Sequence, residues 1–100
     1  MKQHGIDVEL DPEVAKGHYS NLAIISHSTS EFIIDFASLL PGMPKAAVNS
    51  RIILTPEHAK RLLLSLQENI GRYESKMGTI NVPTHGAPTP QGGGFNMGQA

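Results

Sequence analysis

The sequence predicts an α+β domain, in which an antiparallel β-meander of three or four strands precedes one long C-terminal helix. Short apolar segments with strand-like patterns follow one another between residues 6 and 54, and turn-forming residues separate them. A single segment with helical start and stop signals then occupies residues 56–77. We therefore expect a folded domain over residues 1–78. The Pro- and Gly-rich composition of residues 79–100 predicts a disordered tail.

The N-terminal segment predicts one short strand and one helical turn. Residues 6–10 alternate apolar and acidic side chains, which indicates a half-buried strand with its acids facing solvent at a sheet edge. Asp11 is a typical N-cap, Pro12 suits the first helical position, and Gly17 suits the end of the turn.

Residues 19–26 are apolar at odd and at even positions, so we expect a strand that is covered on both faces and central in the sheet. Residues 27–30 form a polar hairpin turn. The chain returns as a strand over residues 32–40, until two prolines and a glycine in residues 41–44 end it. Residues 45–54 predict the last strand.

The helix is the best-defined element. Thr55 is its N-cap, Pro56 takes its first position, and Gly78 ends it after Lys76. At ~1.5 Å per residue it would be about 33 Å long. Two pairs of opposite charge, spaced four residues apart, mark its solvent face: Glu57 with Arg61, and Glu68 with Arg72.

An apolar stripe with alternating steps of four and three follows one side of the helix, the pattern of a helix–helix seam. Its members are Ala59, Leu63, Leu66, Ile70, Tyr73 and Met77. Leu62 and Leu64 widen the apolar arc beyond the ~100° that one sheet would cover. The loop of residues 39–44 or a second copy of the helix could cover the remainder. Gly71 either permits a close approach of another backbone or is tolerated at a cost of ~1 kcal/mol.

We favour the second copy, because a small domain buries a small fraction of its surface and association is a common remedy. The sequence thus predicts a symmetric homodimer packed through the helices. The expected interface residues are Leu63, Leu66, Ile70, Tyr73 and Met77.

The sequence contains no pattern typical of a catalytic or metal-binding site. Without cysteine, no disulfide framework or thiolate metal site can form. The histidines of the folded part, His18, His27 and His58, have no recognised metal-ligand spacing. Ser26 and His27 are neighbours on a strand and point to opposite faces, so they cannot act as nucleophile and base. We expect no enzyme activity, no catalytic residue, no metal and no cofactor.

Polar residues interrupt the apolar strands, and they have two interpretations. Asp35 and Arg51 have opposite charges on adjacent strands, which predicts a structural cross-strand pair. Alternatively, one face of the sheet is polar and recognises a partner, with Lys45, Asn49 and Arg51 as candidate binding residues.

Several blocks of the chain are similar to the domain-of-unknown-function family 3467. The resemblance runs over residues 13–78, and its most specific part is the block of residues 50–62, Ser-Arg-Ile-Ile-Leu-Thr-Pro-Glu-His-Ala-Lys-Arg-Leu. Further matching residues are Tyr19-Ser20-Asn21, Ser26-His27-Ser28, Glu31-Phe32, Asp35-Phe36 and Pro41-Gly42-Met43-Pro44. The resemblance implies the domain boundaries but no biochemical activity.

The expected function is that of a non-catalytic homodimeric module for binding, scaffolding or regulation, whose second partner is another protein. The alternative is a single-stranded nucleic-acid-binding module, because the order of strands and helix is similar to the Whirly, PUR and positive-cofactor-four arrangement. Residues 13–76 carry seven basic and six acidic side chains, which does not favour phosphate binding. No apolar run reaches membrane-spanning length and no signal peptide is evident, so we expect a cytoplasmic protein without membrane contact.

Overall fold

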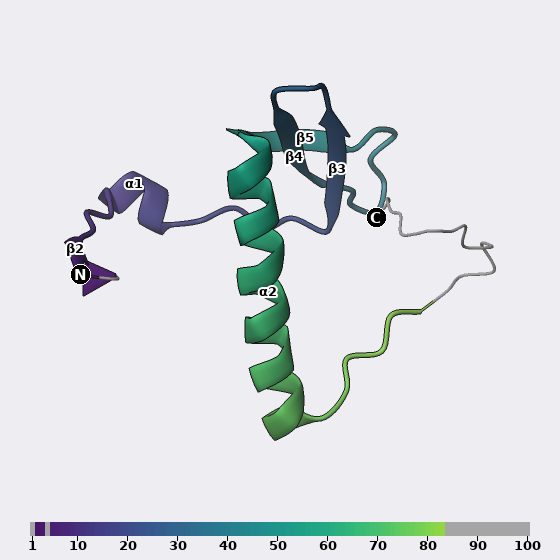
Figure 1. The fold of residues 1–100 in the computed structure, drawn as a ribbon. Coiled ribbons are helices and arrows are strands. Elements are labelled where there is room, and N and C mark those ends of the chain that lie inside the picture. The colour runs from purple at the N-terminus through teal and green to yellow at the C-terminus, as the bar shows by residue number, and fades with distance from the viewer. Residues whose placement is uncertain (1, 4, 84–100) are drawn as a thin grey trace.

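The fold is described for residues 2–3 and 5–83 in a computed structural model (Figure 1). Three antiparallel strands form the main sheet and one long helix follows them, which confirms the predicted α+β meander in its three-stranded form. The elements in chain order are β1 (Lys2–Gln3), β2 (Ile6–Asp7), α1 (Pro12–Ala15), β3 (Leu22–His27), β4 (Phe32–Ser38), β5 (Ala47–Leu54) and α2 (Pro56–Met77).

The main sheet has the order β3-β4-β5, so β4 is the central strand and β3 is an edge strand. The prediction that residues 19–26 form the central strand is therefore wrong for a single chain. Apolar residues on both faces of a strand indicate that both faces should be buried. The position of the strand in the sheet depends instead on which strands form hydrogen bonds with it. Among the described residues β3 pairs with β4 alone, and its Ile24 and Ile25 remain 50% and 57% exposed on opposite faces.

A bulge in β5 changes the register of the sheet between Phe36 and Ala37. Phe36 lies opposite Ser50 and Ala37 lies opposite Val48, so that Asn49 is the extra residue of β5. The bulge bends this strand, and it gives β5 an edge less suited to further pairing than that of β3.

Side-chain hydrogen bonds fix the segment that leads into β3. The Asn21 side chain donates to the Leu39 carbonyl (3.0 Å) and accepts from the Leu39 amide (2.9 Å), so it extends the strand ladder by one pair. Ser20 Oγ donates to the Ala37 carbonyl at 2.9 Å. Ser38 Oγ and Asn49 Nδ2 donate to the Tyr19 carbonyl. These polar side chains therefore replace backbone pairs where the regular sheet ends.

The N-terminal elements lie apart from the main sheet (Figure 1). The expected strand over residues 6–10 is only two residues long and pairs with β1, not with the sheet. Gly5, at φ +75°, allows the tight turn between β1 and β2, so the nearest segment in sequence becomes the partner. Ile6 and Leu10 are exposed and Val8 is partly buried, so the predicted apolar face is covered only in part. The single turn α1 is as predicted, with Asp11 accepting from the Glu13 amide at 2.8 Å.

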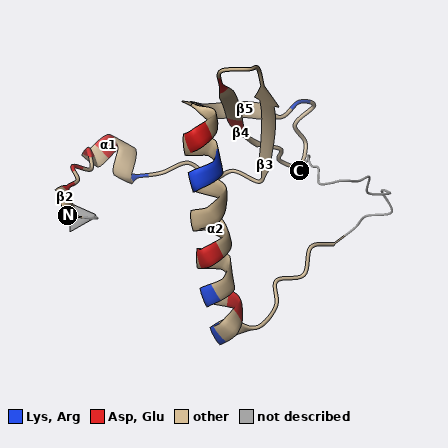
Figure 2. Ribbon diagram, in the orientation of Figure 1, with Lys and Arg blue, Asp and Glu red and all other residues tan. Residues whose placement is uncertain are grey.

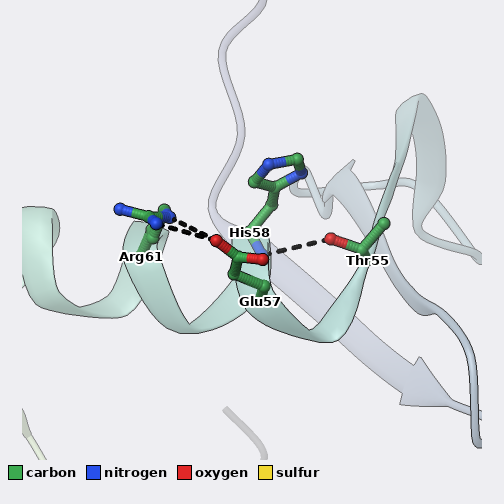
Figure 3. A network of polar contacts seen from close by, with 4 residues as sticks. All are labelled: Thr55, Glu57, His58 and Arg61. Carbon is green, nitrogen blue, oxygen red and sulfur yellow. Dashed lines mark hydrogen bonds and ion pairs between the residues drawn. The ribbon is translucent and has the colours of Figure 1, made fainter.

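Helix α2 has the predicted bounds and caps. Thr55 Oγ1 accepts from the His58 amide at 3.2 Å, and Arg61 donates to the Glu57 carboxylate (Figure 3). Gly78, at φ +95°, ends the helix and donates its amide to the Glu74 carbonyl. The start of α2 adjoins β5, and the helix extends well beyond the sheet (Figure 1).

The chain encloses a very small core. Among the described large and small apolar residues, only Ile34 (7% exposed) and Ala37 (0%) are buried. Both belong to β4 and lie on opposite faces of it, so neither face of the sheet carries a continuous buried layer. Within the described part of the chain, no helix is both long enough and apolar enough to cross a membrane.

The boundary after α2 can be tested by truncation. The Ile80 amide donates to the Glu74 carboxylate at 2.9 Å, so the chain still contacts the helix at Ile80, after Gly78. A chain ending at Val82 should unfold at the same temperature as the full chain. A chain ending at Gly78 should lose at most about 1 kcal/mol, the scale of one exposed hydrogen bond. A lower midpoint for the chain ending at Val82 would show that residues 83–100 contribute to the fold. Of the predicted disordered tail, residues 79–100, the part from residue 84 onward lies outside the described residues.

Candidate functional site

The candidate site is the apolar stripe of α2, which the other described residues leave largely exposed. Every large stripe residue is between 39% (Ile70) and 70% (Met77) exposed. Ala59, in the first turns of the helix, is the one stripe residue that is partly buried. The five residues predicted for a dimer interface, Leu63, Leu66, Ile70, Tyr73 and Met77, therefore form one exposed row along α2.

The loop of residues 39–44 does not cover this stripe. Its own apolar residues Leu39, Leu40 and Met43 are each about half exposed. Every residue of α2 from Lys60 to Tyr73 is also exposed. The exposure of both segments therefore gives no support to the alternative in which the loop folds over the helix.

The apolar surface of α2 is wider than the stripe. Leu62 and Leu64 are 44% and 54% exposed, on either side of Leu63. A side chain at Gly71 would meet no atom within 4 Å, so no close approach inside the chain requires this glycine.

Charged residues on α2 leave its middle free. They lie within residues 57–61 and 68–76, and residues 62–67 between these two groups carry no charge (Figure 2). The two predicted ion pairs are present, with Arg61 at 2.7 Å from Glu57 and Arg72 at 2.8 Å from Glu68. Because both pairs lie on the exposed surface and join residues of one helix, they support the helix and neutralise its solvent face.

Asp35 and Arg51 form the predicted cross-strand pair. They lie directly opposite each other on β4 and β5, and Arg51 donates Nε–H and Nη2–H to the two carboxylate oxygens at 2.7 and 2.9 Å. The Asp35 side chain is only 14% exposed, whereas that of Arg51 is 61% exposed. The hydrogen bond from Arg51 holds the pKa of Asp35 below its ordinary value, and partial desolvation opposes this shift. The bond to Asp35 likewise raises the pKa of Arg51.

The three candidate partner-binding residues do not form a common cationic face. Lys45 lies in the loop before β5, outside the strand predicted for it. Asn49, at the bulge, donates to the Tyr19 carbonyl and to Ser38 Oγ. Arg51 is engaged by Asp35. Two of the three side chains thus already have partners within the chain.

The remaining polar candidates also have structural contacts. His27 stacks on Phe32 with ring centroids 5.3 Å apart, at the end of the β3–β4 hairpin. Over residues 2–3 and 5–83, no three His, Asp or Glu side chains converge in a way that would hold a metal ion.

Sequence reasoning missed the hydrogen-bond role of Ser20 and Ser38 and the exposure of the sheet. The Tyr19-Ser20-Asn21 block offered a signal, since three polar-tipped residues before an apolar strand are typical of side-chain-to-backbone bonding. The exposure of Ile52 and Ile53 on β5 has no such signal, because their pattern indicates burial.

Together, the three-stranded meander, the long capped helix and its exposed apolar stripe define an α+β domain with an unpartnered helix. The family model described as "Protein of unknown function (DUF3467)" matches residues 1–82, and the chain belongs to this family. The match extends beyond residues 13–78, the range of the resemblance, at both ends. No curated protein and no solved structure matches the chain.

The pairing of Asp35 with Arg51 predicts a coupling that depends on pH. Each substitution, Asp35→Ala or Arg51→Ala, should lower stability, and the double variant should cost less than the sum. Because the pKa of Asp35 is lowered in the folded state, its contribution is complete above its ordinary pKa of 3.8. It is lost as the pH falls through the lower, folded value.

Thermal unfolding of the four chains at neutral pH and at increasingly acidic pH would measure this coupling. Its control is Glu68→Ala with Arg72→Ala, an ion pair that is exposed on both sides and joins neighbouring turns of α2. Additive effects of Asp35→Ala and Arg51→Ala at neutral pH would mean that the pair does not hold the strands together.

Proposed function

We propose that this protein is a non-catalytic module that forms a symmetric homodimer through α2 and serves another protein as a binding, scaffolding or regulatory partner. The observation that carries the proposal is the apolar stripe of α2, which is exposed from Leu63 to Met77 in the described chain. A helix in a protein owes most of its stability to the packing of such an apolar face against another surface. A second copy supplies the matching surface without any further component.

The small core supports the same proposal. A single chain buries only Ile34 and Ala37 among its described apolar residues, and fully burying one large aliphatic side chain contributes about 1.5–3 kcal/mol. Ordering the backbone costs about 1–2 kcal/mol for every residue. The folded state therefore needs more apolar burial than one chain provides, and the exposed row from Leu63 to Met77 can supply it in a dimer.

The exposed surface suits a protein partner better than it suits a nucleic acid. Binding to phosphates requires free, clustered cations. Arg51, Arg61 and Arg72 each pair with a carboxylate of the same chain. The exposed surface is instead rich in aliphatic side chains, which is typical of a protein-interaction surface.

Substitution of Leu66 by glutamate tests the dimer. If a second copy covers Leu66, the new carboxylate loses its hydration without gaining a partner, at a cost of several kcal/mol out of a total stability of about 5–15 kcal/mol. Leu66→Glu should thus give a monomer or an unfolded chain, as measured by light scattering together with circular dichroism.

The matched control is Ser65→Glu, which adds the same charge one residue away and outside the stripe. It should keep the mass and helicity of the wild type. A wild-type chain that is well folded and monomeric at high concentration, or a Leu66→Glu variant that still dimerises as tightly as Ser65→Glu, would contradict the proposal.

The nucleic-acid alternative makes the opposite prediction for a titration. Single-stranded oligonucleotides added at low salt should produce no saturable binding, because the free cations are few and scattered. Tight binding that weakens steeply with added salt, and that is lost in Lys45→Ala, would favour the alternative instead.

A further inference from the structure

The stripe of α2 has the same spacing when followed from either end. Its successive steps are four, three, four, three and four residues, so an antiparallel copy can meet it residue for residue. Resting on the proposed dimer, we infer that two copies pair antiparallel in this one register. Leu66 then faces Ile70 of the partner subunit, and Leu63 faces Tyr73 of the partner subunit. At the ends, Ala59 faces Met77 of the partner subunit.

The sizes of the facing side chains fit this register. Ala59 is the smallest member of the stripe, and it faces the long, flexible side chain of Met77 of the partner subunit. In a parallel pair, each residue would face its own counterpart. Two small Ala59 side chains would then leave a gap at one level, whereas two Tyr73 rings would crowd another. Such gaps and crowding both cost stability.

Charges beside the stripe favour the same arrangement. Lys60 and Glu74 flank the stripe on one side, and an antiparallel copy brings each Lys60 next to Glu74 of the partner subunit. Lys60 has no ion-pair partner within the described residues. Glu74 is partly buried, and one of its oxygens accepts from the Ile80 amide at 2.9 Å, which orients the carboxylate. In a parallel pair, the two charges would be separated by about 21 Å along the helix axis.

The antiparallel register also places the exposed C-terminal end of each helix beside the start of the other helix. Ala59 lies at the end of α2 that adjoins the sheet, and it is partly buried there. In this register Met77 of the partner subunit lies opposite Ala59, and Tyr73 of the partner subunit lies one turn away. Antiparallel helices also set the positive end of one dipole beside the negative end of the other.

Engineered thiols test the register directly, because the natural chain has no cysteine. An equimolar mixture of Leu66→Cys and Ile70→Cys chains should form an interchain disulfide on oxidation. Each variant alone should cross-link much less. Ser65→Cys, mixed with Ile70→Cys, is the control outside the stripe and should remain uncross-linked.

The outcomes separate the register from the dimer. Efficient cross-linking of Leu66→Cys with itself, and little cross-linking between the two variants in the mixture, would overturn the antiparallel register while the dimer stands. Absence of every cross-link in chains that light scattering finds monomeric would overturn the proposed dimer as well. Circular dichroism of each variant shows that it has folded before the comparison is made.

Charge reversal at Lys60 and at Glu74 supplies a second measurement. Lys60→Glu chains should associate more weakly than wild type, and so should Glu74→Lys chains, by about two- to fivefold for each like-charge contact. Mixed together, the two variants should form a heterodimer in preference to either homodimer, and added salt should reduce this preference. A mixture that sorts at random would contradict the pairing of Lys60 with Glu74 of the partner subunit.

Discussion

The apolar surface that the described part of the chain leaves exposed is the main physical constraint on this structure. The helix is long, well capped and rich in leucine, but only its first turns adjoin the sheet. The sheet itself buries two residues of its central strand and leaves isoleucines exposed on both of its faces. The described residues of a single chain thus bury little apolar surface, and the proposed dimer would add burial along α2.

Local interactions define the elements without providing a core. Thr55 caps the start of α2, Gly78 ends it, and two ion pairs support its solvent face. In the sheet, Asn21 extends the ladder between β3 and β4, and Asp35 bridges to Arg51 on the exposed side of β5. These contacts determine where each strand and helix begins and how the strands align. They do not supply the apolar burial that holds the elements against one another.

Elements with strong local signals could be predicted from the sequence, and their environment could not. The bounds of α2, the single turn of α1 and the Asp35–Arg51 pair follow from caps, prolines and opposite charges within reach. The predicted central position of β3 is wrong, because a pattern apolar on both faces does not distinguish a central strand from an edge strand that pairs on one side only. The short β2 was misplaced because Gly5 allows a closer partner. Charge and polarity alone group the candidate binding residues Lys45, Asn49 and Arg51. Nothing in the sequence pattern indicates the bulge at Asn49.

The central claim, that folding depends on a second copy, can be tested by following thermal unfolding of the wild-type chain over a wide range of protein concentrations. If dimer and fold are coupled, the midpoint rises steadily with concentration, because association stabilises only the folded chain. Sedimentation equilibrium on the same samples should report a dimer below the midpoint. A midpoint that is independent of concentration, in a sample that sediments as a folded monomer, would contradict the account.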